Sequence, residues 1–483
     1  MNQFINNRYT IVAFILSILN IIFIKNEFIS ITIVIAEILI LLNLLRLNKL
    51  PQFISWYIIF LATSIEFSVF VSNEEDISIF GFKQFRIFGI GISTLFIYIS
   101  FIYTLYKFKF KIIGLRKIRG HINFIRYITI MLIIAVLIGL FNILLNDNNI
   151  QQIPNYFTNF LGQIYLSTWP FLVFYIVYVV LIKYPDGEKN ISRALFAMFI
   201  ATCTAPLLPA VFGVIGSYGE LPYMLVSNSA MLSPFIILFY FYKEYKSPLY
   251  ILLFVTGVVI PLIFFSYVNG KLILLLLILP FLLFFIYRSS MKFTLKSVVL
   301  ISFLVVGIFM TFSNLSKNEG TLFNSKYKEA MGLLDFNNAK YLLLLDPSTR
   351  FRFIEFVNVI DEYKKKPIFL LTGKGFMGSI KDESIKFPFS ETGGFPLDEY
   401  KAHTFYSLHE FTSFILRFGL IGIFSIIIII IHCFRSISYN PWIIIGAYWY
   451  LIFFGYSITL SIVGVSCLSY GCYIYNYRVQ QRH

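Results

Sequence analysis

Long apolar runs, separated by short polar segments, constrain this chain most. Runs such as 28–45, 127–145 and 412–434 carry almost no charge. A helix of about 20 residues crosses the roughly 30 Å hydrocarbon core of a bilayer, so each run predicts a membrane-spanning α-helix. We therefore expect an all-α polytopic membrane protein with about fourteen spans (range 12–14). They lie near 9–25, 28–45, 53–71, 86–106, 127–145, 162–182, 195–216, 222–242, 249–268, 271–287, 297–313, 412–434, 442–457 and 460–475.

Composition agrees with this class. The chain is 58% hydrophobic and 13% charged, whereas soluble domains carry roughly 25% charged residues. A net charge of +15 would suggest a nucleic-acid partner in a soluble protein. Here the charge follows topology instead, so we expect membrane lipids and no nucleic acid as partners.

The lysines and arginines orient the predicted spans. With the N-terminus inside, the inner loops hold most of them, including the dense run 107–126. The short outer loops hold only Lys25, Lys83, Arg86 and Lys271. Cytoplasmic loops are enriched in Lys and Arg, so both termini are predicted to be cytoplasmic.

One large polar insert then faces outward. We divide the chain into spans 1–11 (1–313), an extracytoplasmic loop (314–411), and spans 12–14 with a cytoplasmic C-terminus (412–483). The loop holds as many acids as bases, which is not a polybasic patch. Membrane proteins rarely keep such a loop without using it, so we expect the chemistry there.

The loop has a predicted helix that begins at Asp346-Pro347 and ends near Lys366, before Pro367. Arg350 and Arg352 lie near its start and project about 200° apart. The spacing of Arg352 and Glu355 predicts a surface ion pair.

Two further segments of the loop have no regular pattern. Residues 373–378 (GKGFMG) lack the spacing of a P-loop and predict a tight glycine turn that includes Lys374. Residues 387–400 predict a mobile loop.

Three polar residues lie close to the predicted membrane surface. His403 and His409 are six residues apart, and Glu410 follows the second histidine. This spacing does not match a helical zinc site and no third ligand is evident, so we predict no metal. Acid–base catalysis and plain headgroup contact both stay open for them. Arg417 lies on the same face about two turns deeper, where it either snorkels or pairs with a carboxylate such as Glu66.

The order of these elements resembles the bacterial O-antigen and capsule repeat-unit polymerases (Wzy-type), within the O-antigen polymerase/ligase superfamily. The similar segments are SYVNGKLILLLLIL (266–279), STRFRFIEF (348–356), PIFLLTGKGF (367–376) and HEFTSFILRFGLIG (409–422). They cover the C-terminal half of the chain; the N-terminal spans match only in hydropathy.

The resemblance implies a GT-C-like, metal-independent membrane glycosyltransferase without cofactors. It would act on the outer face of the bacterial cytoplasmic membrane. Its substrate would be an oligosaccharide on undecaprenyl pyrophosphate, joined into O-antigen or capsular polysaccharide beside a flippase and a chain-length regulator.

The resemblance also assigns residue roles. It places Arg350, with Arg352, Lys271, Arg417 and Lys374, at the pyrophosphate or glycan, where cations hold phosphate. Lys271 stands where relatives carry Arg, which loses the bidentate fork. Glu410 matches the family's acidic position and is the first candidate base; His409 and His403 are the alternatives.

Two other functions compete with polymerisation. A flippase for lipid-linked oligosaccharides has a similar length and number of helices, but should have short loops throughout. A ligase or oligosaccharyltransferase of the same superfamily would transfer the same donor glycan to another acceptor; the His-[Asn/Ser/Gln] pair typical of the ligase branch is not evident.

Overall fold

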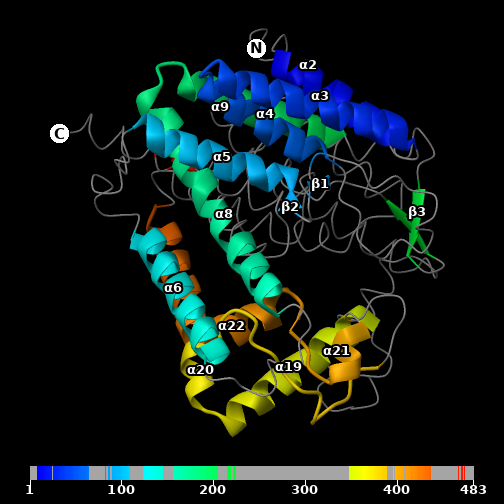
Figure 1. Cartoon of the computed structure of the whole chain (residues 1–483), viewed down its shortest axis with the longest axis vertical. Coiled ribbons are helices and arrows are strands. Elements are labelled where there is room, and N and C mark those ends of the chain that lie inside the picture. The colour runs from blue at the N-terminus through cyan, green and yellow to red at the C-terminus, as the bar shows by residue number, and fades with distance from the viewer. Residues whose placement is uncertain are drawn as a thin grey trace, which may run out of the picture.

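The described part of the chain is mostly helical, in agreement with the predicted class (Figure 1). The structure is a computed structural model. It describes residues 8–23, 26–64, 82, 85–87, 90–108, 123–144, 156–204, 215–218, 221–224, 347–388, 395, 397–406, 408–436, 466, 469–471 and 473.

The N-terminal helices form one group, at the top of Figure 1. They are α2 (Arg8–Ile22), α3 (Glu27–Arg46), α4 (Leu50–Thr63), α5 (Ile92–Lys107) and α9 (Gly187–Thr204). Helix α4 contacts α2, α3 and α9, and nearly all of its side chains are buried. Aromatic rings fill the contact between α4 and α5: Phe53, Tyr57, Phe60, Phe82 and Phe96.

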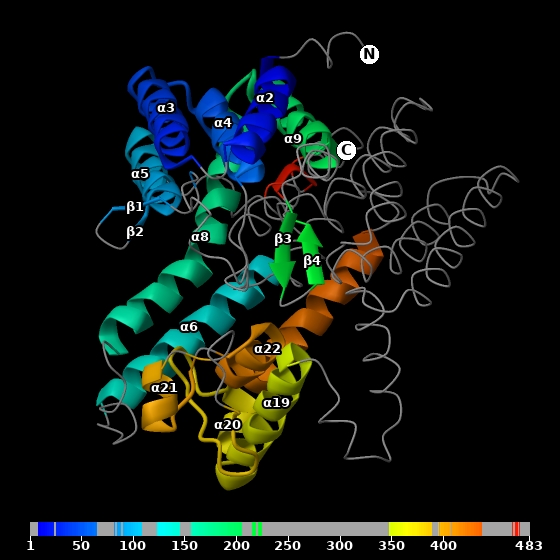
Figure 2. The same cartoon turned by 90° about the vertical axis from the view of Figure 1, so that its right-hand side faces the viewer.

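A second group lies at the opposite end. Helix α8 (Tyr156–Lys183) runs from the first group to the second, where it meets α6 (Asn123–Leu144) (Figures 1 and 2). Helix α22 (Glu410–Ser436) packs on α6. These three helices carry the polar insert.

The insert has a hydrophobic core of its own. It contains α19 (Pro347–Lys365), α20 (Ile368–Thr372) and α21 (Leu397–Ala402), next to the start of α22. The prediction of a loop over 387–400 is wrong at its end, where α21 begins at Leu397. Before it, Phe387 and Phe395 are buried against each other. The core comprises Phe351, Ile354, Val359, Tyr363, Ile380, Phe387, Phe395, Phe405, Leu408, Ile415 and Leu416.

Two short antiparallel hairpins depart from the predicted helices. Strands β1 (Arg86–Ile87) and β2 (Ile90–Gly91) pair at the start of predicted span 86–106. Strands β3 (Ile215–Tyr218) and β4 (Leu221–Met224) pair where helices over 195–216 and 222–242 were expected. Gly219-Glu220 separates β3 from β4, and a glycine in a two-residue connection favours a hairpin over a helix.

The helices near 9–25, 28–45, 53–71, 86–106, 127–145, 162–182 and 412–434 are confirmed as helices, with shifted ends. The predicted helix 195–216 is helical as far as Thr204, but its last two residues belong to β3. Among the described residues, one helix, α3, is long and apolar enough to cross a membrane, and six shorter apolar helices accompany it. The predicted spans 249–268, 271–287, 297–313 and 442–457 lie outside the described residues.

Candidate functional site

Helix α19 presents two cations in its first turns, as predicted. It begins at Pro347 and ends at Lys365, two residues before Pro367. The side chain of Arg350 is partly buried, and its Nε atom is buried without a hydrogen-bond partner. Arg352 is also partly buried. Both guanidinium groups lie near the positive end of the helix dipole, which favours anions.

A buried carboxylate on the same helix binds the start of α22. Glu355 is fully buried, and its Oε1 lies 2.6 Å from His409 Nδ1. The His409 backbone N–H donates to the same carboxylate at 3.1 Å. The Thr412 hydroxyl donates to Glu355 Oε2 at 2.6 Å. Three donors from the start of α22 therefore converge on one carboxylate of α19.

This arrangement fixes the imidazole of His409. A carboxylate oxygen accepts, so the hydrogen bond assigns the proton to Nδ1 and leaves the Nε2 lone pair for an external donor. The His409 side chain is 21% exposed, so part of the ring reaches the surface. The Phe395 ring lies against it, edge-on, with 6.3 Å between ring centroids. A histidine held in this way is suited to general-base chemistry.

The second predicted histidine has a similar but more open setting. His403 Nδ1 lies 3.3 Å from Asp382 Oδ1. Its side chain is 67% exposed, against 21% for His409. The His403 ring is therefore largely exposed, and it makes a matched control for His409.

Lys374 is engaged by the protein itself. Its ammonium pairs with Glu362 at 2.9 Å and donates to the Ser379 carbonyl oxygen at 2.6 Å. It also lies 5.7 Å from the centroid of the Phe369 ring. These contacts join α19 to the glycine turn, so we assign Lys374 to packing of the loop rather than to substrate contact.

The glycine turn packs against a kink in α22. Gly419 has non-helical dihedral angles (φ 55°, ψ −148°), so the helical hydrogen bonds across it are lost. Three consecutive carbonyls before the kink find other donors. Ile415 O accepts from the Tyr363 hydroxyl at 2.6 Å, Leu416 O from Lys374 N at 2.7 Å, and Arg417 O from Gly375 N at 3.1 Å. The predicted tight turn at 373–378 is confirmed, with this capping role.

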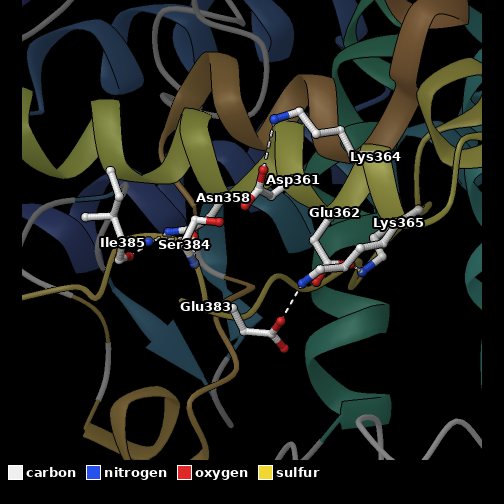
Figure 3. Close-up of polar contacts among 9 residues, drawn as sticks. Asn358, Asp361, Glu362, Lys364, Lys365, Glu383, Ser384 and Ile385 are labelled. Carbon is white, nitrogen blue, oxygen red and sulfur yellow. Dashed lines mark hydrogen bonds and ion pairs between the residues drawn. The ribbon is translucent and has the colours of Figure 1, made fainter.

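Helix α19 also holds the segment that follows the turn (Figure 3). Asn358 Nδ2 donates to the Ile385 carbonyl oxygen at 2.9 Å, and its Oδ1 accepts from Ser384 N at 3.3 Å. An exposed ion pair joins Lys365 to Glu383; their hydrogen bond raises the pKa of Lys365 and lowers that of Glu383. Hydrogen bonds and an ion pair therefore hold α19 against the segment 383–385.

The remaining predicted site residues are less closely connected. Arg417 is partly buried just before the kink, and no described residue forms an ion pair with it. Glu410 is the first residue of α22, and its side chain is not described. Lys271 and Glu66 lie outside the described residues.

One functional candidate was missed and one prediction was wrong. Glu355 was predicted to form a surface ion pair with Arg352, but it is fully buried and bound by His409 and Thr412. Its position in an apolar stripe, beside Phe351, Ile354 and Val359, was the sequence signal for burial. Its partner lies 54 residues away, which no local pattern reveals.

Within the described residues, no group of three or more His, Cys, Asp and Glu side chains is placed to hold a metal ion. Comparison of the chain with protein-family models, curated proteins and solved structures found no match.

Proposed function

We propose that this protein is a membrane glycosyltransferase that joins oligosaccharide repeat units carried on undecaprenyl pyrophosphate. The observation that carries the proposal is the buried Glu355–His409 pair, with Arg350 one and a half turns earlier on the same helix. The base and the cation belong to elements that pack together, since α19 contacts α22, and the Nε of Arg350 is buried without a hydrogen-bond partner. Polymerisation of a lipid-pyrophosphate donor requires both.

The proposed chemistry is a single displacement. His409 Nε2 takes the proton of an acceptor sugar hydroxyl, and that oxygen attacks the anomeric carbon of the donor glycan. The bond from this carbon to the pyrophosphate oxygen breaks, and undecaprenyl pyrophosphate leaves with the bonding electrons. Arg350 neutralises the charge that builds on the leaving group. Arg352, which projects about 200° away from it, is the alternative for this role.

Glu355 supports this step through Nδ1, the ring nitrogen of His409 that does not take the proton. As His409 becomes an imidazolium ion, the carboxylate 2.6 Å from Nδ1 stabilises its charge and holds the ring orientation. We therefore prefer His409 over Glu410 as the base, which reverses the order that the resemblance suggested.

The proposal includes a location and an architecture. The protein would cross the bacterial cytoplasmic membrane about fourteen times in a GT-C-like arrangement. The loop 314–411 would face outward and both termini would face the cytoplasm. The α3 helix and the charge asymmetry of the loops support a membrane location.

Deletion of the gene, with and without complementation, tests the proposal. The length distribution of surface polysaccharide is measured by gel electrophoresis. Glycan reduced to a single repeat unit supports a polymerase. Surface glycan lost altogether, with repeat units on the cytoplasmic face, would indicate a flippase instead. Full-length chains left on the lipid carrier would indicate a ligase.

A pair of matched variants tests the proposed phosphate contact. Arg350→Ala should abolish long chains while the protein still inserts, because the buried Nε of this partly buried side chain has no hydrogen-bond partner in the protein. Lys364→Ala removes an exposed cation from the same helix and should leave chain length unchanged. Normal chain lengths with Arg350→Ala would remove Arg350 from the site.

A further inference from the structure

The turn after α20 is an irregular segment whose backbone N–H groups all find acceptors within the protein. Each N–H from Gly373 to Gly378 has a protein acceptor: Phe369 O, Leu416 O, Arg417 O, Ala135 O, Gln163 Oε1 and Gly375 O, in that order. Most residues of the turn are buried, and a buried backbone N–H requires a partner. The turn thereby also meets the requirement for backbone at membrane depth, where lipid offers no hydrogen-bond partners.

Four of these six acceptors, those of Ala135, Gln163, Leu416 and Arg417, lie on three predicted spans and agree on one depth. A Cβ atom on Gly375 would lie 2.7 Å from Ala135 O and 2.8 Å from Gly139 N, so the turn touches the α6 backbone. By the predicted orientation, Gly139 and Ala135 lie about 9 and 15 Å below the outer end of span 127–145. Gln163 lies at the outer end of α8, and the α22 kink lies within its first turns. All three contacts point to the outer leaflet.

The short helix before the turn exposes an apolar face. Ile368, Leu370 and Leu371 are 63%, 42% and 49% exposed. Three consecutive lysines, residues 364–366, precede them across Pro367. A sharp boundary between lysines and exposed aliphatic side chains is typical of a segment at a membrane interface.

The apolar surface continues onto the neighbouring helices. Helix α20 packs on α22, whose Phe424 and Ile427 are exposed, and α6 exposes Ile133 and Leu137. In a membrane-spanning chain the exposed apolar faces of α6 and α22 contact lipid, and α20, which packs on α22, brings further exposed apolar side chains to these helices.

We propose that α20 and the glycine turn dip into the outer leaflet, with Ile368, Leu370 and Leu371 against lipid acyl chains. The loop 314–411 is then not wholly extracytoplasmic, and its catalytic helix α19 is anchored to the membrane surface at its C-terminal end. This inference rests on the membrane placement of α6 and α22 in the proposed function, and not on the glycosyl-transfer chemistry.

Fluorescence quenching by brominated lipids tests the insertion. The four native cysteines of the full chain are replaced by alanine, and single cysteines are introduced by Leu371→Cys, Ile133→Cys and Leu397→Cys. Each variant is labelled with an environment-sensitive dye and placed in nanodiscs of phosphatidylcholine, with or without bromine at mid-depth of an acyl chain. Leu397 on α21 is the matched control, since it is 52% exposed, as is Ile133 on α6.

The expected result is that bromine lowers the emission at 371 to roughly half, as at 133, and leaves that at 397 unchanged. Quenching at 133 without quenching at 371 would overturn the insertion of α20 alone. Emission that is the same with and without bromine at all three positions would overturn both this inference and the membrane placement of α6. If Leu371→Cys fails to fold, Ile368→Cys replaces it under the same criteria.

Discussion

Replacement of Glu355 separates the packing role of this carboxylate from its proposed role in catalysis. Glu355→Ala removes the acceptor for the His409 backbone N–H and for Nδ1–H. The Thr412 hydroxyl keeps an acceptor, because it also donates to the His409 carbonyl oxygen at 2.8 Å. Each buried donor left without a partner costs about 1–3 kcal/mol. We expect the free energy of unfolding to fall by about 2–6 kcal/mol in total.

Glu355→Gln keeps the shape of the side chain. Its amide oxygen can still accept from both His409 donors, and its NH₂ group can donate to Thr412 Oγ1, 2.6 Å from the present carboxylate. The exchange of charge-assisted for neutral hydrogen bonds should cost about 1–2 kcal/mol. The neutral amide cannot stabilise an imidazolium ion, so the polymerisation rate should fall about 10²–10⁴-fold.

The assay measures both quantities on the same preparation. Thermal unfolding of the purified protein gives stability, and extension of lipid-linked repeat units in nanodiscs gives the rate. Our reasoning predicts a stable and inactive Gln variant beside an unstable Ala variant. A Gln variant with the wild-type rate would refute the role of Glu355 in catalysis, and equal stability losses would refute the hydrogen-bond argument.

Three more predictions follow from the same geometry. His409→Ala should abolish polymerisation while His403→Ala keeps it, because His409 is 21% exposed and lies 2.6 Å from Glu355, whereas His403 is 67% exposed and lies 3.3 Å from Asp382. Chain length on gels checks this, and equal effects of the two variants would contradict it. Gly373→Ala should lower the free energy of unfolding by about 2–4 kcal/mol, since φ is +71° and the Cβ would lie 2.3 Å from the Arg417 backbone. Gly162→Ala on α8 is the control, because its Cβ meets open space and the change should be neutral or slightly stabilising. Thermal unfolding compares the two variants, and similar melting temperatures would contradict the close packing of the turn on α22. Burial raises the pKa of Tyr363, so its neutral hydroxyl stays the donor to Ile415 O, and Tyr363→Phe should cost about 1–3 kcal/mol. The folded state disfavours the phenolate, so the stabilisation by the Tyr363 hydroxyl is present below the unfolded pKa of about 10 and is lost as the pH rises above it. A difference in the free energy of unfolding between wild type and Tyr363→Phe that stays constant to about pH 11 would contradict this.

Local sequence patterns predicted the elements well where the chain signals its own ends. Pro347 and Pro367 bracket α19, and the helix was expected within one residue of both bounds. The glycines at 373, 375 and 378 marked the turn. These signals act through the backbone of a few neighbouring residues, so one sequence suffices to detect them.

Long-range pairing was not predictable in the same way. Glu355 and His409 are 54 residues apart, and their pairing depends on how α19 packs against the start of α22. Arg352 was a nearer partner for Glu355 in the sequence, but the apolar neighbours of Glu355 turn it inward. Hairpin β3–β4 was missed because its residues sit among apolar runs that equally fit a membrane helix.

Reconstitution tests the central claim most directly. The purified protein in nanodiscs is supplied with undecaprenyl-pyrophosphate-linked repeat units and nothing else, and the products are separated by gel electrophoresis. We predict a ladder of glycans with release of undecaprenyl pyrophosphate, and no ladder from the His409→Ala variant. A wild-type protein that leaves single units unchanged, or an undiminished ladder from His409→Ala, would contradict the account.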